Sequence, residues 1–476
     1  MMRTLIRTVL LFYFLLFSIA CFAQQSDKLS LSDKLYGLSK FWSEVNYNFV
    51  YKYKIDADLW DRTYKQAIEN VQRTKTDYEY YRELKKLCAV LKDGHTSVYF
   101  PDQIQNKILT SNFGDVRMSL MNVEGKTLIV QTNKSQEKAI PFASEVVKVN
   151  GLATDEYQDK FVKPYISSST QQGTINNASS QLLSGLEGDE YDIEIRTPKG
   201  QLKKLHLVHA VTAEKDVSPV FIGNKPPFEL RWLQDKIAYI GMNTFDDAAI
   251  VKEFMGNLPE ITKARSVIID IRNNGGGSSK NAREIAKYFT AGNLIYGARN
   301  YSREIIPTDR ALGSFLEAKD TVAGRPQWGL SASECKEYYK SYTGNTFHAY
   351  KYAPDTVQEV AKIKVPVVVL TSNYTASAAE DFLIYLDREK NITRVGDFTN
   401  GSTGQPLQVA LPGGGSAWIC TKKVTFSDGR EFVGKGIEPH VIVKQTKNDI
   451  LYPSKFDGQL KAAIEKLAVV SKDISN

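Results

Sequence analysis

An unbroken apolar run, residues 367–370, constrains the fold of this chain more than any other feature. A strand with one face in water alternates apolar and polar residues, whereas these four are valine or leucine throughout. The run therefore predicts a strand covered on both faces, as in an α/β sheet. Small residues follow, and Ser377 lies among them where the predicted helix begins. A turn of this kind can present a nucleophile, but serine is equally favoured as a helix cap, so the segment alone supports both interpretations.

The rest of the C-terminal half also alternates between strand and helix patterns. We expect strands at residues 237–241 and 266–271, and helices near 249–258 and 279–289. This alternation predicts an α/β core. Between residues 296 and 361 lies a stretch rich in Tyr, Lys, Gly and Pro. We interpret it as an insertion near the site, although its composition is equally compatible with a solvated excursion.

Two differently patterned regions precede this core. From about residue 30 to 100, apolar residues recur at three-to-four spacing, which indicates helices. Thr76 and Glu79 form a capping box in front of the last helix, and a glycine supplies a helix stop just before His95. From about residue 108 to 211, short β-like runs alternate with turns, which indicates a small β-rich module.

The N-terminus has the pattern of a secretory signal peptide. Two arginines precede the apolar run 9–20, and small residues stand before a cut after Ala23. We therefore expect residues 1–23 to be removed and the mature chain to be exported to the bacterial periplasm or cell surface. Lipoprotein anchoring through Cys21 is the alternative. No later segment approaches 18 consecutive apolar residues, so we expect no integral membrane span in the mature chain.

The composition narrows the class of protein. The 476 residues are 42% hydrophobic and 24% charged, as in soluble globular proteins of two or three domains. Without the two arginines of the signal peptide, the formal charge falls from +7 to +5. No basic run contains interleaved aromatics, so we expect no nucleic-acid partner. Cys88, Cys335 and Cys420 lack CxxC spacing, and we expect them in the core rather than in disulfides or metal sites.

A glycine-rich strand end carries a second chemical signal. Residues 267–277 read VIIDIRNNGGG, so a buried strand ends in three glycines before a predicted helix. Exposed backbone N–H groups at a helix N-terminus stabilise negative charge, which suits an oxyanion hole. They would equally suit a phosphate, but the chain has neither GxGxxG nor a P-loop motif. We interpret Asp270 and Arg272 as a structural ion pair that braces this loop.

Four ordered motifs carry a resemblance to a known family: IIDIRNNGGG, TASAAE, VGDFTNGSTGQP and GKGIEPHVIV. Together they resemble the C-terminal processing peptidases (tail-specific proteases), a family of serine peptidases. The resemblance implies an α/β fold, α+β overall, in which a crotonase-like peptidase core follows an N-terminal helical segment and a β-rich PDZ-like domain. The stretch SEVVKVNG, residues 144–151, is itself similar to a strand and turn of PDZ domains. The expected divisions are 24–105 (helical), 106–215 (PDZ-like), 216–455 (core, with the insertion) and 456–476 (C-terminal helix).

The resemblance implies Ser377 as the nucleophile, with an oxyanion hole formed by the backbone of Ala378 and Gly276. In the Ser–Lys branch of the family a lysine activates the serine, but Ser402 stands at the matching position here. Because a serine hydroxyl at its ordinary pKa is a poor nucleophile, another base is needed. His95 matches the general base of the histidine-using, tricorn-core-like branch, so we predict it as the base.

A third residue should orient the imidazole and stabilise its protonated form. The same branch uses a glutamate near the end of the core, and Glu431 is the nearest equivalent, with Glu438 a weaker choice. A solvated strand carboxylate is an equal alternative for Glu431. Ser402 and Gln405 are predicted to line the substrate site.

These residues predict an exported serine endopeptidase that cleaves peptide or protein substrates by acyl transfer, without a metal or cofactor. The competing class is a catalytically disabled peptide- or ligand-binding protein, because retinoid-binding proteins of vertebrate photoreceptors resemble the same core. The joint occurrence of Ser377, His95 and the glycine triplet favours the enzyme.

Overall fold

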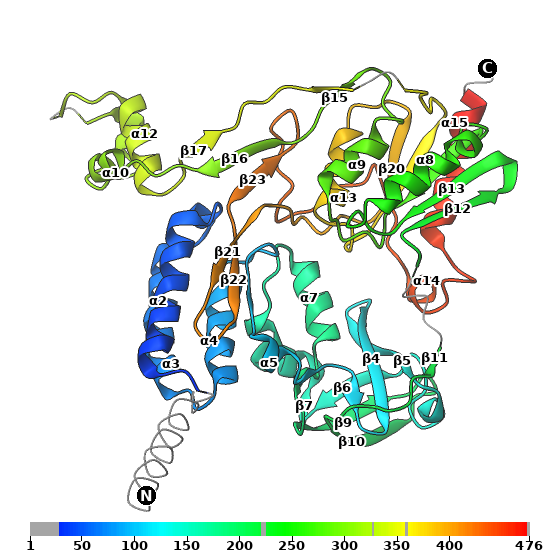
Figure 1. Cartoon of the computed structure of the whole chain (residues 1–476), viewed down its shortest axis with the longest axis horizontal. Helices are drawn as coiled ribbons and strands as arrows, with labels where there is room; N and C mark the ends of the chain where they lie inside the picture. The colour runs from blue at the N-terminus through cyan, green and yellow to red at the C-terminus, as the bar shows by residue number, and fades with distance from the viewer. Residues whose placement is uncertain (1–27, 220–224, 326–327, 358–359, 474–476) are drawn as a thin grey trace, which may run out of the picture.

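The structure is a computed structural model that describes residues 28–219, 225–325, 328–357 and 360–473. The predicted signal peptide lies outside the described residues. Figure 1 shows three parts in chain order: N-terminal helices in blue, a small sheet in cyan to green, and a larger sheet with its helices in green to red. In the described ranges, no helix is both long and apolar enough to cross a membrane.

The larger sheet has six strands in the order β12-β13-β14-β19-β20-β24. All neighbours from β13 to β24 run parallel, and β12 is antiparallel to β13. Every residue of β14 and β19 is buried, which confirms the strand predicted from the unbroken apolar run. The strands span Phe228–Leu233 (β12), Ile237–Met242 (β13), Ser266–Asp270 (β14), Val367–Thr371 (β19), Ile392–Gly396 (β20) and Val441–Ile442 (β24).

Helices cover both faces of this sheet, because alternate residues of each strand point to opposite sides. Val367 and Val369 face the core shared with helices α8 (Ala249–Ile261), α9 (Ser279–Ala286) and α13 (Ala378–Tyr385). Val368 and Leu370 face the C-terminal helix α15 (Gly458–Asp473). The α/β fold class expected from the sequence is confirmed.

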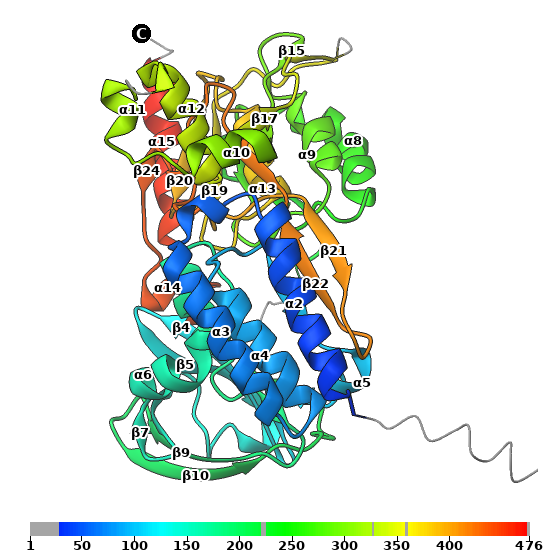
Figure 2. The ribbon, with the colours of Figure 1, turned by 90° about the vertical axis from the view of Figure 1, so that its left-hand side faces the viewer.

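The N-terminal helices are joined to this core by strand pairing. Helices α2 (Leu31–Asn48), α3 (Ala57–Arg73) and α4 (Asp77–Ala89) pack together, and the predicted capping box of α4 is present. After α4 the chain turns into β1 (Ser97–Tyr99), which pairs antiparallel with β22 (Ser416–Cys420) of the core. Strand β22 forms a hairpin with β21 (Pro406–Ala410), beside α2 in Figure 2. This pairing brings the loop before β1 to the core.

The β-rich module has its own sheet and its own apolar core. Its main strands are ordered β10-β9-β6-β5-β4-β3, and helix α7 (Gln171–Ser180) packs on β4. The PDZ-like stretch forms β6 followed by the Asn150–Gly151 turn, with positive φ at both turn residues. The strands span Asn112–Phe113 (β3), Val116–Val123 (β4), Lys126–Asn133 (β5), Glu145–Val149 (β6), Glu190–Arg196 (β9) and Leu202–Val208 (β10).

The predicted insertion is a folded excursion from the core. Strand β16 (Arg299–Arg303) pairs with β17 (Phe347–Ala349) and with β23 (Lys422–Thr425) of the core. Between β16 and β17 lie helices α10 (Pro307–Gly313) and α12 (Ala332–Tyr342), which extend away from the sheet at the upper left of Figure 1. Cys335 is buried in α12, and Cys88 and Cys420 are buried elsewhere, all three as free thiols.

A buried ion-pair network pins α15 to the end of β14. Arg272 binds Asp270 (Nη2 to Oδ2, 2.7 Å) and Asp457 (Nη1 to Oδ1, 2.8 Å). Burial alone would raise the pKa of Asp270, but Arg272 lowers it to about 2. The interpretation of Asp270 and Arg272 as a bracing pair therefore agrees with their contacts.

We expect Arg272→Ala to lower the free energy of unfolding by about 3–5 kcal/mol, because it leaves a buried carboxylate without its partner. Arg283→Ala is the matched control: its half-exposed pair with Asp355 (2.8 Å) should contribute less than about 1 kcal/mol. Urea unfolding followed by circular dichroism measures both. Equal losses in the two variants would contradict the structural role of Arg272.

Candidate active site

Ser377 lies in a strained turn between β19 and α13. Its backbone angles are φ 55° and ψ −121°, a conformation that non-glycine residues rarely adopt. Such strain persists only where surrounding contacts impose it, and it clusters at functional sites. Ser377 does occupy the N-cap position of α13, so both interpretations of this serine share one location. The strain distinguishes it from an ordinary cap, whose backbone is extended.

Hydrogen bonds join the loop before Ser377 to the glycine loop after β14. Thr375 Oγ1 donates to the carbonyl of Ile271 (2.9 Å), and Ala376 N–H donates to the carbonyl of Asn274 (3.1 Å). These bonds hold the two strand ends side by side. The glycine loop therefore forms one wall around the nucleophile candidate.

Gly276 packs directly against the turn. A Cβ atom at this position would lie 2.7 Å from Ser377 Cβ and 3.0 Å from the Ala378 nitrogen, so only glycine fits. Its φ of 109° is also unfavourable for other residues. Ala378 begins α13, where the N–H has no acceptor inside the helix. The Gly276 N–H, the other predicted oxyanion donor, is already hydrogen-bonded to Asn274 Oδ1 (2.9 Å).

A fully buried carboxyl group, that of Glu380, organises the base of the site. It accepts hydrogen bonds from Ser377 N–H (3.1 Å), Ser402 N–H (3.1 Å), Gly401 N–H (2.8 Å) and Thr399 Oγ1 (2.5 Å). Burial raises the pKa of Glu380 to about 8, although the four donors act to lower it. Glu380 is not among the residues predicted at the site. The sequence did contain a signal for Glu380: the spacing Ser377-x-x-Glu380 at the start of a helix is that of a capping box.

His95 contacts Ser402. Its Nδ1 lies 2.8 Å from Ser402 Oγ, across 307 residues of sequence. Burial, together with the positive charge of Lys422, lowers the pKa of His95 to about 4, so the imidazole is neutral near pH 7. The other four histidines lie in the PDZ-like module, in β17 and next to β24.

Ser402 connects the two predicted catalytic residues. It is buried, and its carbonyl accepts the N–H of Ser377 (3.0 Å) while its hydroxyl meets the imidazole of His95. In the described part of the chain, no hydrogen bond joins Ser377 directly to His95. Ser377 and His95 each contact Ser402 and are not hydrogen-bonded to each other. Catalytic hydrogen bonds are often long or poorly aligned when no substrate is bound.

The structure does not bring Glu431 to His95. Glu431 lies in an irregular loop, not on an extended strand, and its carboxylate binds Lys423 (2.5 Å) with Lys54 at 3.9 Å. These ammonium groups lower its pKa. A charge-assisted bond to Lys423 holds the side chain at the half-exposed surface of β23. Glu438 and Gln405 are exposed, and the described residues give neither side chain a hydrogen bond to His95.

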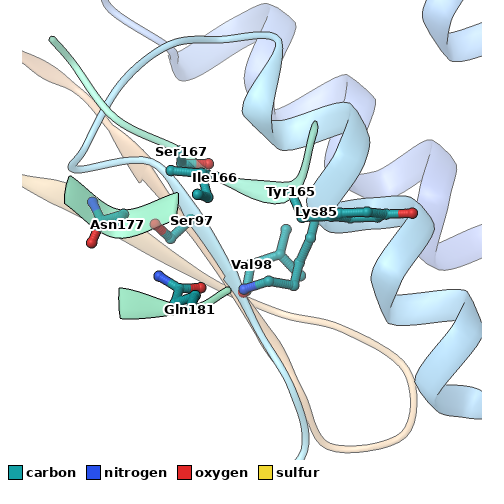
Figure 3. A pocket seen from close by; sticks show the side chains of 8 residues that line it. All are labelled: Lys85, Ser97, Val98, Tyr165, Ile166, Ser167, Asn177 and Gln181. Carbon is teal, nitrogen blue, oxygen red and sulfur yellow. The ribbon is translucent and has the colours of Figure 1, made fainter. Parts of the chain in front are cut away.

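Two cavities lie outside this group of residues, and neither is lined by Ser377, His95 or Ser402. The larger, of about 800 Å³, opens where parallel strands end, a common position for ligands in α/β sheets. Asn273, Ser372 and Tyr374 line it from the core, and the β4–β5 hairpin and α7 line it from the PDZ-like module. The smaller, of about 150 Å³, lies where β1 meets the segment after residue 164; Figure 3 shows Lys85 reaching into it. The Lys85 Nζ donates to the carbonyl of Val98 (3.2 Å). Among the described residues, no cluster of three side chains is suited to a metal ion.

Residues 236–443, which contain the sheet, the glycine loop and Ser377, match the model of peptidase family S41. The match covers less than half of the chain, namely most of its α/β core. The resemblance to C-terminal processing peptidases is thereby confirmed.

Known relatives extend the likeness beyond the core. The chain is 23% identical over 390 residues to the carboxy-terminal processing protease CtpB of Bacillus subtilis (strain 168), covering 80% of this chain and 66% of the relative, just under two thirds of its length. The structure of mature CPAF complexed with lactacystin has a TM-score of 0.63 at 14% identity, covering 94% of this chain and 99% of that one. The photosystem II D1 C-terminal processing protease has a TM-score of 0.44 at 16% identity, covering 87% of this chain and 93% of that one.

We expect Glu380→Ala to lower the free energy of unfolding by about 3 kcal/mol or more, since four buried donors lose their acceptor. Glu334→Ala removes the same capping-box position from the exposed start of α12, and should cost about 1 kcal/mol or less. Urea unfolding compares the two variants. Similar losses would mean that Glu380 is an ordinary helix cap.

Proposed function

We propose that this protein is an exported serine peptidase that cleaves peptide bonds by acyl transfer, with Ser377 as nucleophile and His95 as general base. The strained turn that presents Ser377 beside the glycine loop carries the proposal. Nucleophilic serines are characteristically exposed at sharp, strained strand-to-helix turns. The match of residues 236–443 to a peptidase family model and the likeness to a carboxy-terminal processing protease support peptides or proteins as substrates.

The proposed chemistry is that of a serine peptidase. Ser377 Oγ attacks the carbonyl carbon of the scissile bond while its proton passes to His95 Nε2. Backbone N–H groups of Ala378 and Gly276 stabilise the oxyanion, the latter after exchanging its bond to Asn274 Oδ1 for the substrate oxygen. His95 then protonates the leaving amine as the C–N bond breaks. Water, deprotonated by His95, hydrolyses the acyl-enzyme and restores Ser377.

The larger cavity suits an extended peptide. It lies between the core and the PDZ-like module and is lined by Tyr374, three residues before the nucleophile. We propose that substrate enters here, with the PDZ-like module forming one wall. Export to the periplasm or cell surface rests on the signal-peptide pattern of residues 1–23.

A disabled binding protein on the same fold is the second candidate. It is favoured by the contact of His95 with Ser402 instead of Ser377, and by the pairing of Glu431 with lysines. A protein of this class would keep the peptide-binding cavity and lack a reactive serine.

A fluorophosphonate probe should label the mature protein at Ser377. We expect Ser377→Ala to abolish labelling and His95→Ala to slow it by roughly 10²–10⁴-fold, the range for loss of a general base. Ser331→Ala, which removes an unstrained N-cap serine of α12, should label like the unaltered protein. Absence of labelling in the unaltered protein would favour the binding protein.

The imidazole of His95 should titrate near pH 4, because burial and Lys422 disfavour its charged form. The base is then already free at pH 5–8. His206 is an internal control: it is exposed, and its hydrogen bond to Asp192 raises its pKa above 6.5. Proton NMR of the five histidine Cε1–H signals between pH 3.5 and 8 measures both values. A His95 midpoint at or above 6.5 would contradict the burial of a neutral base.

A further inference from the structure

The residue that orients the imidazole of His95 is not Glu431, because the carboxylate of Glu431 pairs with lysines instead. A group that serves the imidazole must contact Nδ1, the nitrogen opposite the one that takes the serine proton. The atom recorded there is Ser402 Oγ, at 2.8 Å. Ser402 is only 4% exposed, so its hydroxyl meets the imidazole in a site with little competing water.

The backbone of Ser402 is fixed relative to the nucleophile. Its N–H binds the carboxyl of Glu380, and its carbonyl accepts the N–H of Ser377. Glu380 also accepts the N–H of Ser377, so one buried carboxyl positions both serines. A rigid scaffold of this kind keeps a catalytic group within tenths of an ångström of its productive place.

The chain also leaves room for this hydroxyl. A Cβ atom on Gly94, the neighbour of His95, would lie 2.6 Å from Ser402 Oγ, closer than such atoms approach. Gly94 N–H is held instead by Ser169 Oγ (2.9 Å). The absence of a side chain at position 94 therefore permits the contact between His95 and Ser402.

The charged groups around His95 do not contact Nδ1, where the orienting partner of the ring must lie. Lys422 is the charged residue that acts on the imidazole, and it repels a proton. Asp93 is buried two residues away, but it accepts the backbone N–H of His95 and the hydroxyl of Thr96 (2.6 Å) rather than the ring. Among the described residues, no carboxylate is recorded in contact with Nδ1.

We propose that Ser402 is the positioning residue of the site: its hydroxyl oxygen accepts the Nδ1–H of His95, and this selects the tautomer whose Nε2 is free to take the proton of Ser377. The proposal rests on the proposed peptidase function. Ser402 orients the ring as a triad carboxylate does, but as a neutral acceptor it gives less stabilisation to the imidazolium. Ser402 acts through His95 and has no bond to the reacting atoms.

The tautomer of His95 tests this directly. We expect nitrogen-15 NMR of the histidine-labelled protein at pH 7 to show His95 as the Nδ1–H tautomer, with His95→Gln assigning the signal. Ser402→Ala should shift it toward the Nε2–H tautomer. The fluorophosphonate labelling rate at Ser377 should fall by about 10-fold, the effect of one neutral hydrogen bond. Ser169→Ala removes a hydroxyl that holds the same loop through Gly94, and should leave the tautomer unchanged.

An Nε2–H tautomer in the unaltered protein would overturn the proposal, and this result does not depend on the folding of Ser402→Ala. An unchanged tautomer and labelling rate in Ser402→Ala would also overturn it. Labelling that is lost in Ser402→Ala but kept in Ser377→Ala would make Ser402 the nucleophile instead. Failure of the peptidase proposal is distinguishable, because it removes labelling from the unaltered protein without changing the tautomer.

Discussion

The carboxyl group of Glu380 is the contact on which the geometry of the site depends. It accepts three backbone N–H groups and one hydroxyl from two chain segments that leave neighbouring strands. A buried carboxyl is costly unless its oxygens are satisfied, and here all four bonds come from residues around the nucleophile turn. The strained backbone of Ser377 is therefore held by a group that cannot relax without leaving itself unpaired.

A second constraint brings the proposed base, His95, to this turn. His95 belongs to the N-terminal helical part, and it reaches the core because β1 pairs with β22, over 300 residues later in the chain. Cys420 N–H donates to Thr96 Oγ1 (3.0 Å), which anchors the same loop from its other side. The proposed catalytic pair thus depends on the docking of two parts of the molecule, so the site is complete only when the N-terminal helical part has packed on the core.

The site departs from a serine–histidine–carboxylate arrangement in its third position. Glu431 is drawn to Lys423, and a buried hydroxyl lies at the imidazole instead. Burial and the charge of Lys422 keep His95 neutral, which leaves it free to accept a proton but makes it a weaker base than an ordinary histidine. A neutral third residue can orient the imidazole ring, but it stabilises the imidazolium less than a carboxylate does. The chemistry of such a site would depend more heavily on the proposed oxyanion donors at Ala378 and Gly276.

The sequence by itself determined the buried strands, the helices that follow them and the glycine loop, because apolar periodicity and turn residues are properties of neighbours in the chain. Its motifs carried the resemblance to a peptidase family and the prediction of Ser377. It also indicated His95, through its motif. Only the tertiary structure decided which side chain contacts the imidazole of His95. Ser402, which does so, lies 307 residues from His95 in sequence, whereas Glu431 binds a lysine. Contacts at such separation depend on the path of the whole chain and on competing charges, which no local pattern records.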